Sequence, residues 1–155
     1  MARILVITGP TASGKSGLAM DLAEKYSLEI ISADSMQVYR HMDIGTDKAS
    51  QEDQKRVPHH LIDVKDPDEP WSVEEFQRGA AKAIENISRR DNIPCVVGGT
   101  GFYIRALLHS FPLQQAPPNL SLRLELNAIA TSKGREAVHG LLKYIDPESY
   151  QDLHP

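Results

Sequence analysis

The segment GPTASGKS, residues 9–16, decides the fold of this chain. It matches the pattern G-x-x-x-x-G-K-[S/T], whose glycines let the backbone curl until several N–H groups point at one anion. The apolar residues 4–7 precede it as a predicted strand covered on both faces, and residues 16–26 follow with the apolar spacing of a helix. We therefore expect a phosphate-binding loop between a buried strand and the first helix, whose positive dipole end faces the phosphate.

Every residue of this loop is a candidate ligand for a phosphate-bearing substrate. Lys15 can place a positive charge on the terminal phosphates, and Ser16 can offer its hydroxyl to a Mg²⁺ ion shared with the ligand. The pattern predicts phosphate binding without identifying ATP. ATPases of this type add a second acid at the end of a later strand, and residues 96–99 (VVGG) contain none. The predicted binding residues are Gly9, Pro10, Thr11, Ala12, Ser13, Gly14, Lys15 and Ser16.

The following elements alternate between strands and helices. Residues 29–34 (EIISAD) and 93–97 (IPCVV) are predicted buried strands, and residues 35–69 form a long, partly helical connection between them. Ser72 and the glutamate three residues later form a capping box, which predicts the start of a helix. A further helix is expected around residues 102–109. This order predicts an α/β fold with a parallel sheet and flanking helices.

A change of composition near residue 111 marks a domain edge. Residues 111–119 (FPLQQAPPN) are rich in proline and predict a linker. In residues 120–126 leucines alternate with polar residues as in a strand, yet most of these residue types favour helices, so both structures stay open. Residues 135–145, after Gly134, predict a helix.

Composition places the chain among ordinary globular domains. It has 155 residues, 41% of them hydrophobic, and a net charge of -4, which argues against indiscriminate binding of nucleic acids. The single cysteine, Cys95, lies in an apolar run and predicts a buried, reduced thiol. No apolar run approaches the roughly 20 residues that span a membrane, and the N-terminus predicts a strand rather than a signal peptide. We expect a cytoplasmic protein with no membrane partner.

Two side chains outside the loop are candidates for chemistry at the same edge of the sheet. Asp34 ends the second predicted strand, and open α/β sheets bind ligands beyond the carboxyl ends of their strands. Asp34 is either a turn residue or a functional carboxylate, acting as a general base or beside a metal. Thr100, in the cluster GGTG of residues 98–101, offers its hydroxyl to substrate or belongs to a plain turn. For His59 and His60 a structural or surface role is favoured over metal binding, because adjacent side chains diverge.

Taken together, these segments resemble the tRNA dimethylallyltransferase family. Besides the phosphate loop, the resemblance is carried by ISADSMQVYRHMDIGTDK from residue 31, VPHHLIDV from residue 57, VVGGTGFYIRAL from residue 96 and IDPESYQDLHP at the end. It extends over essentially the whole chain. The loop alone is shared by many families, whereas the combination of ADSMQVYR, PHHLID and GGTGFY is highly specific.

The resemblance implies a transferase that moves a dimethylallyl group from dimethylallyl diphosphate to N6 of an adenosine beside the anticodon of tRNA. The loop would then hold the diphosphate leaving group, and Mg²⁺ would help to stabilise the charge that develops on it. Because no phosphoryl group is transferred, such a reaction does not need the missing second acid. The implied partners are tRNA and dimethylallyl diphosphate, and we expect a monomer.

The resemblance also assigns roles to single residues. Asp34 resembles the general base that accepts a proton or a hydrogen bond from the attacking N6 amine. Thr100 resembles a residue that orients the substrate at the diphosphate side, and these two are the implied catalytic residues. Arg123 resembles an arginine near the tRNA. The implied tRNA-binding residues are Asp34, Ser35, Met36, Gln37, Thr100 and Arg123.

The resemblance further implies how the chain is divided. It predicts a P-loop NTPase-like α/β core over residues 1–112 and part of a helical insertion domain over residues 113–155. Relatives continue after a segment like DLHP into an arginine-rich helix and further strands. The chain therefore corresponds to the N-terminal portion of the family, and basic residues in the remaining portion would account for its acidic net charge.

Three other functions stay open at this point. A small-molecule or nucleoside kinase would use the same loop with an acid after the second strand. It needs arginines that clamp phosphate, for which Arg105, Arg123 and Arg135 are the late candidates. A relative that prenylates free adenine nucleotides would accept AMP in place of tRNA. A nucleotide-binding regulatory module would lose little function on Asp34→Ala.

Overall fold

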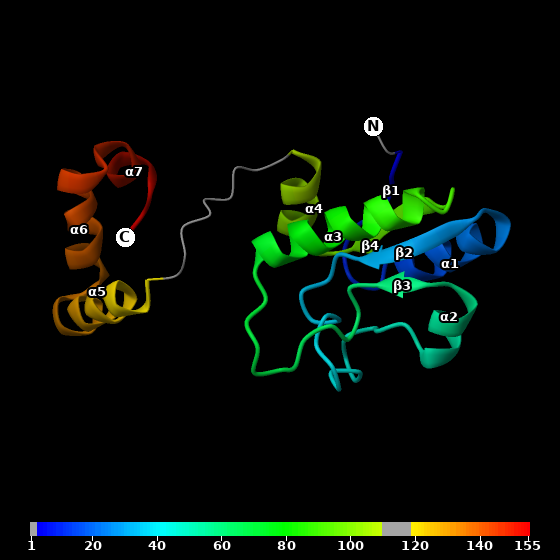
Figure 1. Cartoon of the computed structure of the whole chain (residues 1–155). Helices are drawn as coiled ribbons and strands as arrows, with labels where there is room; N and C mark the ends of the chain where they lie inside the picture. The colour runs from blue at the N-terminus through cyan, green and yellow to red at the C-terminus, as the bar shows by residue number, and fades with distance from the viewer. Residues whose placement is uncertain (1–2, 110–118) are drawn as a thin grey trace. The chain divides into compact units, whose positions relative to one another are not determined.

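The computed structural model describes residues 3–109 and 119–155. They belong to two compact units, Met1–Leu113 and Gln114–Pro155 (Figure 1). The predicted linker up to residue 118 and the predicted domain boundary after residue 112 lie outside the described residues. None of the helices in the two described ranges is long and apolar enough to cross a membrane.

The first unit is built on a four-stranded parallel sheet with the strand order β1-β4-β2-β3. Because all neighbouring strands are parallel, their carboxyl ends meet at one edge. Leu5 pairs with Cys95, and Ile31 pairs with Val96. The predicted α/β fold with a parallel sheet is confirmed. The strands are β1 Leu5–Thr8, β2 Leu28–Ser32, β3 His59–His60 and β4 Ile93–Gly98.

Helices cover both faces of this sheet (Figure 1). The helices of the first unit are α1 Lys15–Lys25, α2 Gln51–Arg56, α3 Val73–Ser88 and α4 Gly101–Leu108. Successive strand residues point to opposite faces, so Ile31 and Val96 pack with α3 and α4, while Ile30 and Cys95 pack with α1. Cys95 is buried and free, as its apolar surroundings predicted.

The start of α3 follows directly from its sequence. The hydroxyl of Ser72 accepts a hydrogen bond from the N–H of Glu75 at 3.2 Å, and Glu75 Oε2 accepts from the N–H of Ser72 at 3.0 Å. The predicted capping box is therefore confirmed. One residue further, Phe76 is buried and stacks on Tyr103 with the ring centroids 4.5 Å apart. This pair ties α3 to α4.

β1 departs from its expected burial. Leu5 is 36% exposed, although the apolar run predicted a strand covered on both faces. Within the described residues, β1 lies at the edge of the sheet and pairs with β4 alone. The run predicts the strand correctly and its burial wrongly, because hydrophobicity within one segment does not encode the order of the strands.

A charged cluster is buried at the start of β2. The carboxylate of Glu29 is 4% exposed and accepts hydrogen bonds from Arg90 Nη2 and Asn92 Nδ2, each at 2.8 Å. The ring Nε2 of His60 lies 2.7 Å from the same carboxylate, which is the structural role expected for this histidine. Burial alone would raise the pKa of Glu29, but the hydrogen bonds from Arg90, Asn92 and His60 outweigh burial and lower it to about 2.

We expect Glu29→Gln to lower the free energy of unfolding by about 2–3 kcal/mol at pH 7, because the charge-assisted hydrogen bonds are lost. The pKa of Glu29 in the folded chain lies below its ordinary value of 4.5, so this stabilisation is present above pH 4.5 and is lost as the pH falls towards 2. Urea unfolding of both proteins at pH 7 and pH 3 measures it. A difference that is the same at both pH values would contradict the carboxylate charge as its cause.

The second unit is formed by α5 Leu120–Lys133, α6 Arg135–Ile145 and α7 Pro147–Asp152. The side chain of Asn119 caps α5 by accepting a hydrogen bond from the N–H of Leu122 at 3.0 Å. Residues 120–126, for which strand and helix were both open, are helical. Their residue types and this cap outweigh the alternating pattern. The helix predicted over residues 135–145 is confirmed with these bounds.

Candidate functional site

The phosphate loop connects β1 to α1. Gly14 has a φ of 81°, a left-handed conformation that glycine adopts without strain, and α1 begins directly after it at Lys15. The ammonium of Lys15 donates a hydrogen bond to the carbonyl of Pro10 at 2.6 Å and so lies folded across its own loop. The strand-loop-helix context that the motif requires is therefore present, with a lysine charge and a helix N-terminus at one place.

A cavity of about 560 Å³ opens beside this loop at the carboxyl edge of the sheet. Most of its lining comes from the loop with α1, from the connection that follows β2 and from the end of β4. This is where open α/β sheets bind their ligands. The predicted site residues that line the cavity are Thr11, Ala12, Lys15, Ser16, Asp34, Met36 and Gln37. Those that lie on the same turns outside the lining are Gly9, Pro10, Ser13, Gly14, Ser35 and Thr100.

Asp34 lies two residues beyond the end of β2, which stops at Ser32 rather than at the aspartate. Its Oδ1 accepts hydrogen bonds from the N–H groups of Met36 at 2.8 Å and Gln37 at 3.3 Å, so it closes a turn. Its Oδ2 accepts no hydrogen bond from any residue that the structure describes. Asp34 thus has the turn role that the sequence left open, and it still lines the cavity with a second oxygen available for chemistry.

Thr100 lies beside this turn because the ends of β2 and β4 meet there. Its hydroxyl accepts a hydrogen bond from the N–H of Ser35, and its own N–H donates to the carbonyl of Ala33, both at 3.2 Å. Gly98 permits this approach, since a Cβ on that residue would lie 2.2 Å from the carbonyl oxygen of Ala33. The backbone therefore holds the threonine hydroxyl next to the turn that carries Asp34.

We expect Gly98→Ala to destabilise the chain by about 1–3 kcal/mol, because the new Cβ forces the backbone of Ala33 away. A Cβ on Gly101, three residues later, meets no atom within 4 Å. Gly101→Ala is therefore the matched control and should leave the unfolding midpoint nearly unchanged. Thermal unfolding of the three proteins measures both effects, and equal midpoints for the two variants would contradict the close approach.

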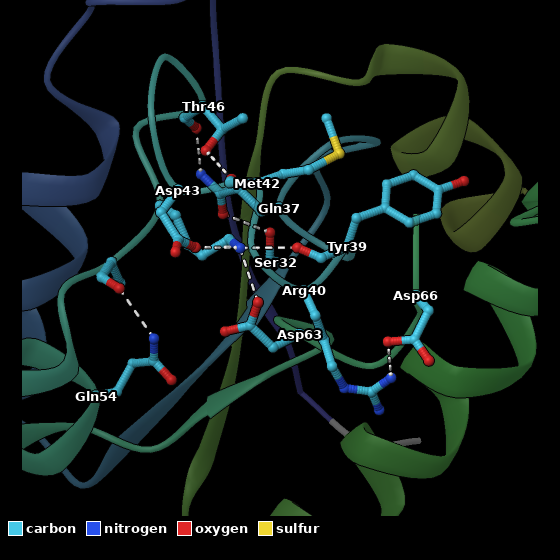
Figure 2. Close-up of polar contacts among 12 residues, drawn as sticks. Ser32, Gln37, Tyr39, Arg40, Met42, Asp43, Thr46, Gln54, Asp63 and Asp66 are labelled. Atoms are coloured by element: carbon cyan, nitrogen blue, oxygen red, sulfur yellow. Dashed lines mark hydrogen bonds and ion pairs between the residues drawn. The ribbon is translucent and has the colours of Figure 1, made fainter. Parts of the chain in front are cut away.

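The connection after β2 is held in place by Gln37, whose side-chain amide is hydrogen-bonded to three residues. Figure 2 shows its contacts with Ser32 and Thr46. Its Oε1 accepts a hydrogen bond from the hydroxyl of Ser32 at 2.9 Å. Its Nε2 donates to the carbonyls of Thr46 at 3.1 Å and Asp47 at 3.0 Å. The hydroxyl of Thr46 in turn donates to the carbonyl of Met42 at 2.7 Å. Gln37 thereby fastens residues 42–48, hereafter the cavity loop, to the end of β2.

Lys48 is the second anchor of the cavity loop, and sequence reasoning missed it. Its side chain is only 4% exposed, and its ammonium donates hydrogen bonds to the carbonyl of Tyr39 at 2.8 Å and to Asp43 and Asp63 at 2.7 Å each. Figure 2 shows the three acceptors, on Tyr39, Asp43 and Asp63, around a single nitrogen atom. Burial alone would lower the pKa of Lys48, but the hydrogen bonds to the two aspartates outweigh burial and raise it. Because Lys48 lies in a polar stretch of the sequence, no pattern predicted its burial.

The paired histidines and Arg123 are the remaining candidates from the sequence. His59 lines the cavity, its Nδ1 lies 2.7 Å from the carbonyl of Val57, and burial lowers its pKa. Within the described residues, no group of three or more His, Cys, Asp or Glu side chains is arranged to hold a metal ion. Arg123 is an exposed residue of α5 in the second unit. The residues that line the cavity belong to the first unit, and Arg123 is not among them.

Two family models match the chain. The model described as IPP transferase matches residues 37–155, and the model described as isopentenyl transferase matches residues 2–65. The first begins at Gln37 and includes the cavity loop and the second unit. The second includes the phosphate loop, β2 and the turn at Asp34. Each therefore covers part of the cavity lining.

Known proteins are similar to the chain over almost its whole length. A tRNA dimethylallyltransferase of Geobacillus thermodenitrificans is 48% identical over 153 residues, which are 99% of this chain and 49% of that protein. The crystal structure of a full-length tRNA isopentenylpyrophosphate transferase from Bacillus halodurans has a TM-score of 0.71 at 45% identity, covering 100% of this chain and 51% of that one. A eukaryotic dimethylallyltransferase acting on tRNA has a TM-score of 0.80 at 33% identity, covering 100% of this chain and 38% of that one.

The chain spans about half the length of the curated relatives that it matches. Identities of 41–48% with these relatives extend far beyond the phosphate loop, which many families possess. The P-loop NTPase-like sheet is likewise the fold of the solved relatives. On these grounds the chain belongs to the tRNA dimethylallyltransferase family.

Proposed function

We propose that this chain carries the donor site of a tRNA-modifying prenyltransferase. The enzyme moves a dimethylallyl group from dimethylallyl diphosphate to N6 of an adenosine adjacent to the anticodon and releases diphosphate. One observation carries the proposal: Lys15, the cation of the phosphate loop, and Asp34, a carboxylate whose Oδ2 accepts no hydrogen bond within the described residues, line the same cavity. The names of the relatives, which are tRNA dimethylallyltransferases, support this choice of donor and acceptor.

The proposed reaction breaks the bond between the allylic carbon and the diphosphate oxygen, and it joins that carbon to N6. The bonding electron pair leaves with the diphosphate, where Lys15 and the N–H groups of the loop stabilise the added charge. The N6 amine gives up a proton, which Asp34 accepts through its Oδ2. Two backbone N–H groups donate hydrogen bonds to Oδ1. They therefore keep Oδ2 in its orientation while the adenine N6 reacts.

The acceptor base is proposed to enter beside the turn at Asp34. It has to leave the stack of the anticodon loop, which costs a few kcal/mol. Met36 is 43% exposed on the cavity wall and offers an apolar surface to the base, while Ser35 and Thr100 flank the turn. Gln37 contributes by holding the cavity loop, since both of its amide hydrogens are used there. Arg123 is proposed to contact the tRNA from the second unit.

Ser16 is the residue proposed to hold Mg²⁺. Its hydroxyl lies on the cavity wall, 3.5 Å from Oδ2 of Asp47. An exposed hydroxyl beside a carboxylate is a pair of oxygen ligands of the kind that Mg²⁺ prefers, so the residues present fit the ion. When bound there, Mg²⁺ supplies positive charge to the departing diphosphate.

The cellular setting is part of the proposal. Cys95 is the only cysteine of the sequence, and burial raises the pKa of its thiol to about 11. An inert, unpaired thiol suits a reducing compartment, so we propose that the protein modifies tRNA in the cytoplasm. We also propose that it acts as a monomer, which light scattering during size-exclusion chromatography tests.

Calorimetric titration of the chain with dimethylallyl diphosphate and, separately, with ATP tests the donor, both with Mg²⁺ present. We expect the allylic diphosphate to bind more tightly than ATP. Tight binding of ATP together with indifference to the allylic diphosphate would contradict the proposal and favour a small-molecule or nucleoside kinase.

The acceptor is tested by an assay of prenyl transfer. An RNA anticodon stem-loop and AMP are offered in parallel with radiolabelled dimethylallyl diphosphate, and the label that enters each is counted. We expect transfer to the RNA. Transfer to AMP in preference to the RNA would identify an enzyme that prenylates free nucleotides instead.

A further inference from the structure

We propose that Asp47 is the second acid of the cation site at Ser16, supplied by the cavity loop instead of by the end of a strand. This inference rests on the proposed function, which places a diphosphate and a divalent cation at the phosphate loop. ATPases with this loop take the second acid from the end of a later strand. Here β4 ends at Gly98 and Gly99 follows, so that position has no carboxylate.

The structure brings Asp47 to the phosphate loop from a distant part of the sequence. Its Oδ2 lies 3.5 Å from the hydroxyl of Ser16, and both residues line the cavity. Neighbouring oxygen ligands of an octahedral Mg²⁺ lie about 3 Å apart, since each is about 2.1 Å from the ion. The two oxygens therefore need to approach by only about half an ångström to share one ion.

The backbone of Asp47 is fixed, so this placement does not depend on a freely moving surface side chain. Its φ of 51° lies in the left-handed region. Its carbonyl accepts a hydrogen bond from Gln37 Nε2 at 3.0 Å, and Gln37 is held in turn by Ser32 of β2. The next residue, Lys48, is anchored by three acceptors. The carboxylate thus projects from a short segment that is fastened on both sides.

The charge of Asp47 also requires a partner. Asp43 and Asp63, the other acids at the cavity loop, form ion pairs with Lys48. Within the described residues, Asp47 has no ion pair. An unpaired carboxylate 3.5 Å from the hydroxyl of Ser16 repels a diphosphate bound in the phosphate loop, unless a cation lies between the two negative groups. Because of the charge on Asp47, we expect diphosphate binding to depend strongly on a divalent cation.

The experiment uses inorganic pyrophosphate and Mn²⁺ as probes, with Asp47→Asn as the variant. Asparagine retains the shape and tolerates the left-handed backbone, so the variant tests the charge. We expect the affinity for Mn²⁺ in the presence of pyrophosphate to fall about tenfold, measured as free Mn²⁺ by electron paramagnetic resonance. Without metal, the substitution should have the opposite effect. In EDTA, we expect pyrophosphate to bind Asp47→Asn a few-fold more tightly than the unsubstituted chain, because a like charge has been removed, and calorimetry measures this affinity.

Asp21→Asn is the matched control, because Asp21 lines the same cavity from α1 and, within the described residues, its carboxylate makes no hydrogen bond or ion pair. It should change both affinities less than twofold. If pyrophosphate binding requires Lys15 but Asp47→Asn equals Asp21→Asn in both measurements, the role of Asp47 is refuted and the proposed donor site stands. If the unsubstituted chain binds no pyrophosphate with Mn²⁺, the inference and the donor site fall together.

Discussion

Lys15→Ala is expected to weaken the binding of dimethylallyl diphosphate at least about a hundredfold, which corresponds to about 3 kcal/mol. The ammonium lies across the phosphate loop, and its only hydrogen bond within the described residues goes to the carbonyl of Pro10. A diphosphate that enters the loop replaces this neutral acceptor with a charged one, and charge-assisted hydrogen bonds are the stronger kind. Calorimetric titration with the ligand and Mg²⁺ measures the loss.

Lys25→Ala is the control for this prediction. Lys25 is an exposed residue in the last turn of the same helix, so its removal changes the net charge equally without touching the loop. Its affinity for the ligand should stay within about twofold of the parent chain, because exposed distant charges are screened by salt. Equal losses in the two variants would mean that overall charge, and not the loop, governs binding.

Asp34→Asn has the second large expected effect, a fall in the rate of prenyl transfer of about 10²–10⁴-fold, the range of general base catalysis. An asparagine keeps an oxygen at Oδ1, so the hydrogen bonds from Met36 and Gln37 can persist and the turn remains. The Oδ2 position becomes an amide that cannot accept the proton of N6. The single-turnover rate of prenyl transfer to an anticodon stem-loop measures the change.

The affinity for dimethylallyl diphosphate separates loss of the base from loss of the fold. We expect it to remain within about threefold in Asp34→Asn, because the donor binds at the loop and not at the carboxylate. Asp21→Asn, which removes another acid from the cavity lining, should leave the rate nearly unchanged. A full rate in Asp34→Asn would exclude this residue as the base and leave it as a turn residue alone.

Sequence reasoning predicted the parts of the fold that depend on local chemistry. The loop at residues 9–16, the capping box at Ser72 and the helix over residues 135–145 all follow from hydrogen bonds and apolar spacing between near neighbours. The convergence of Asp34 with the loop also follows, because the carboxyl ends of parallel strands meet at one edge. In each case the relevant partners lie within a few residues of one another or at the same edge of the sheet.

What the sequence did not predict depends on contacts between distant segments. The exposure of Leu5 follows from the order of the strands, which no single segment encodes. The burial of Lys48 requires Asp63, fifteen residues away, and a backbone carbonyl. Asp47 lies next to Ser16 because Gln37 holds the cavity loop at the end of β2. Polar residues in an aperiodic stretch carry no pattern from which such pairings can be derived.

The cavity has one wall at the turn of Asp34 and another at the cavity loop, and these walls differ in the timescale on which they can move. Asp34 lies on a turn next to which the N–H of Ser35 donates to the hydroxyl of Thr100 and the N–H of Thr100 donates to the carbonyl of Ala33, so displacing this wall breaks hydrogen bonds at the ends of β2 and β4. The cavity loop is attached mainly through the side chains of Gln37 and Lys48, which can detach while the sheet stays intact. Loop motions of this kind take about nanoseconds to microseconds, and collective ones up to milliseconds. Opening this wall would therefore admit the donor faster than an enzyme of ordinary turnover, about 10 per second, consumes it.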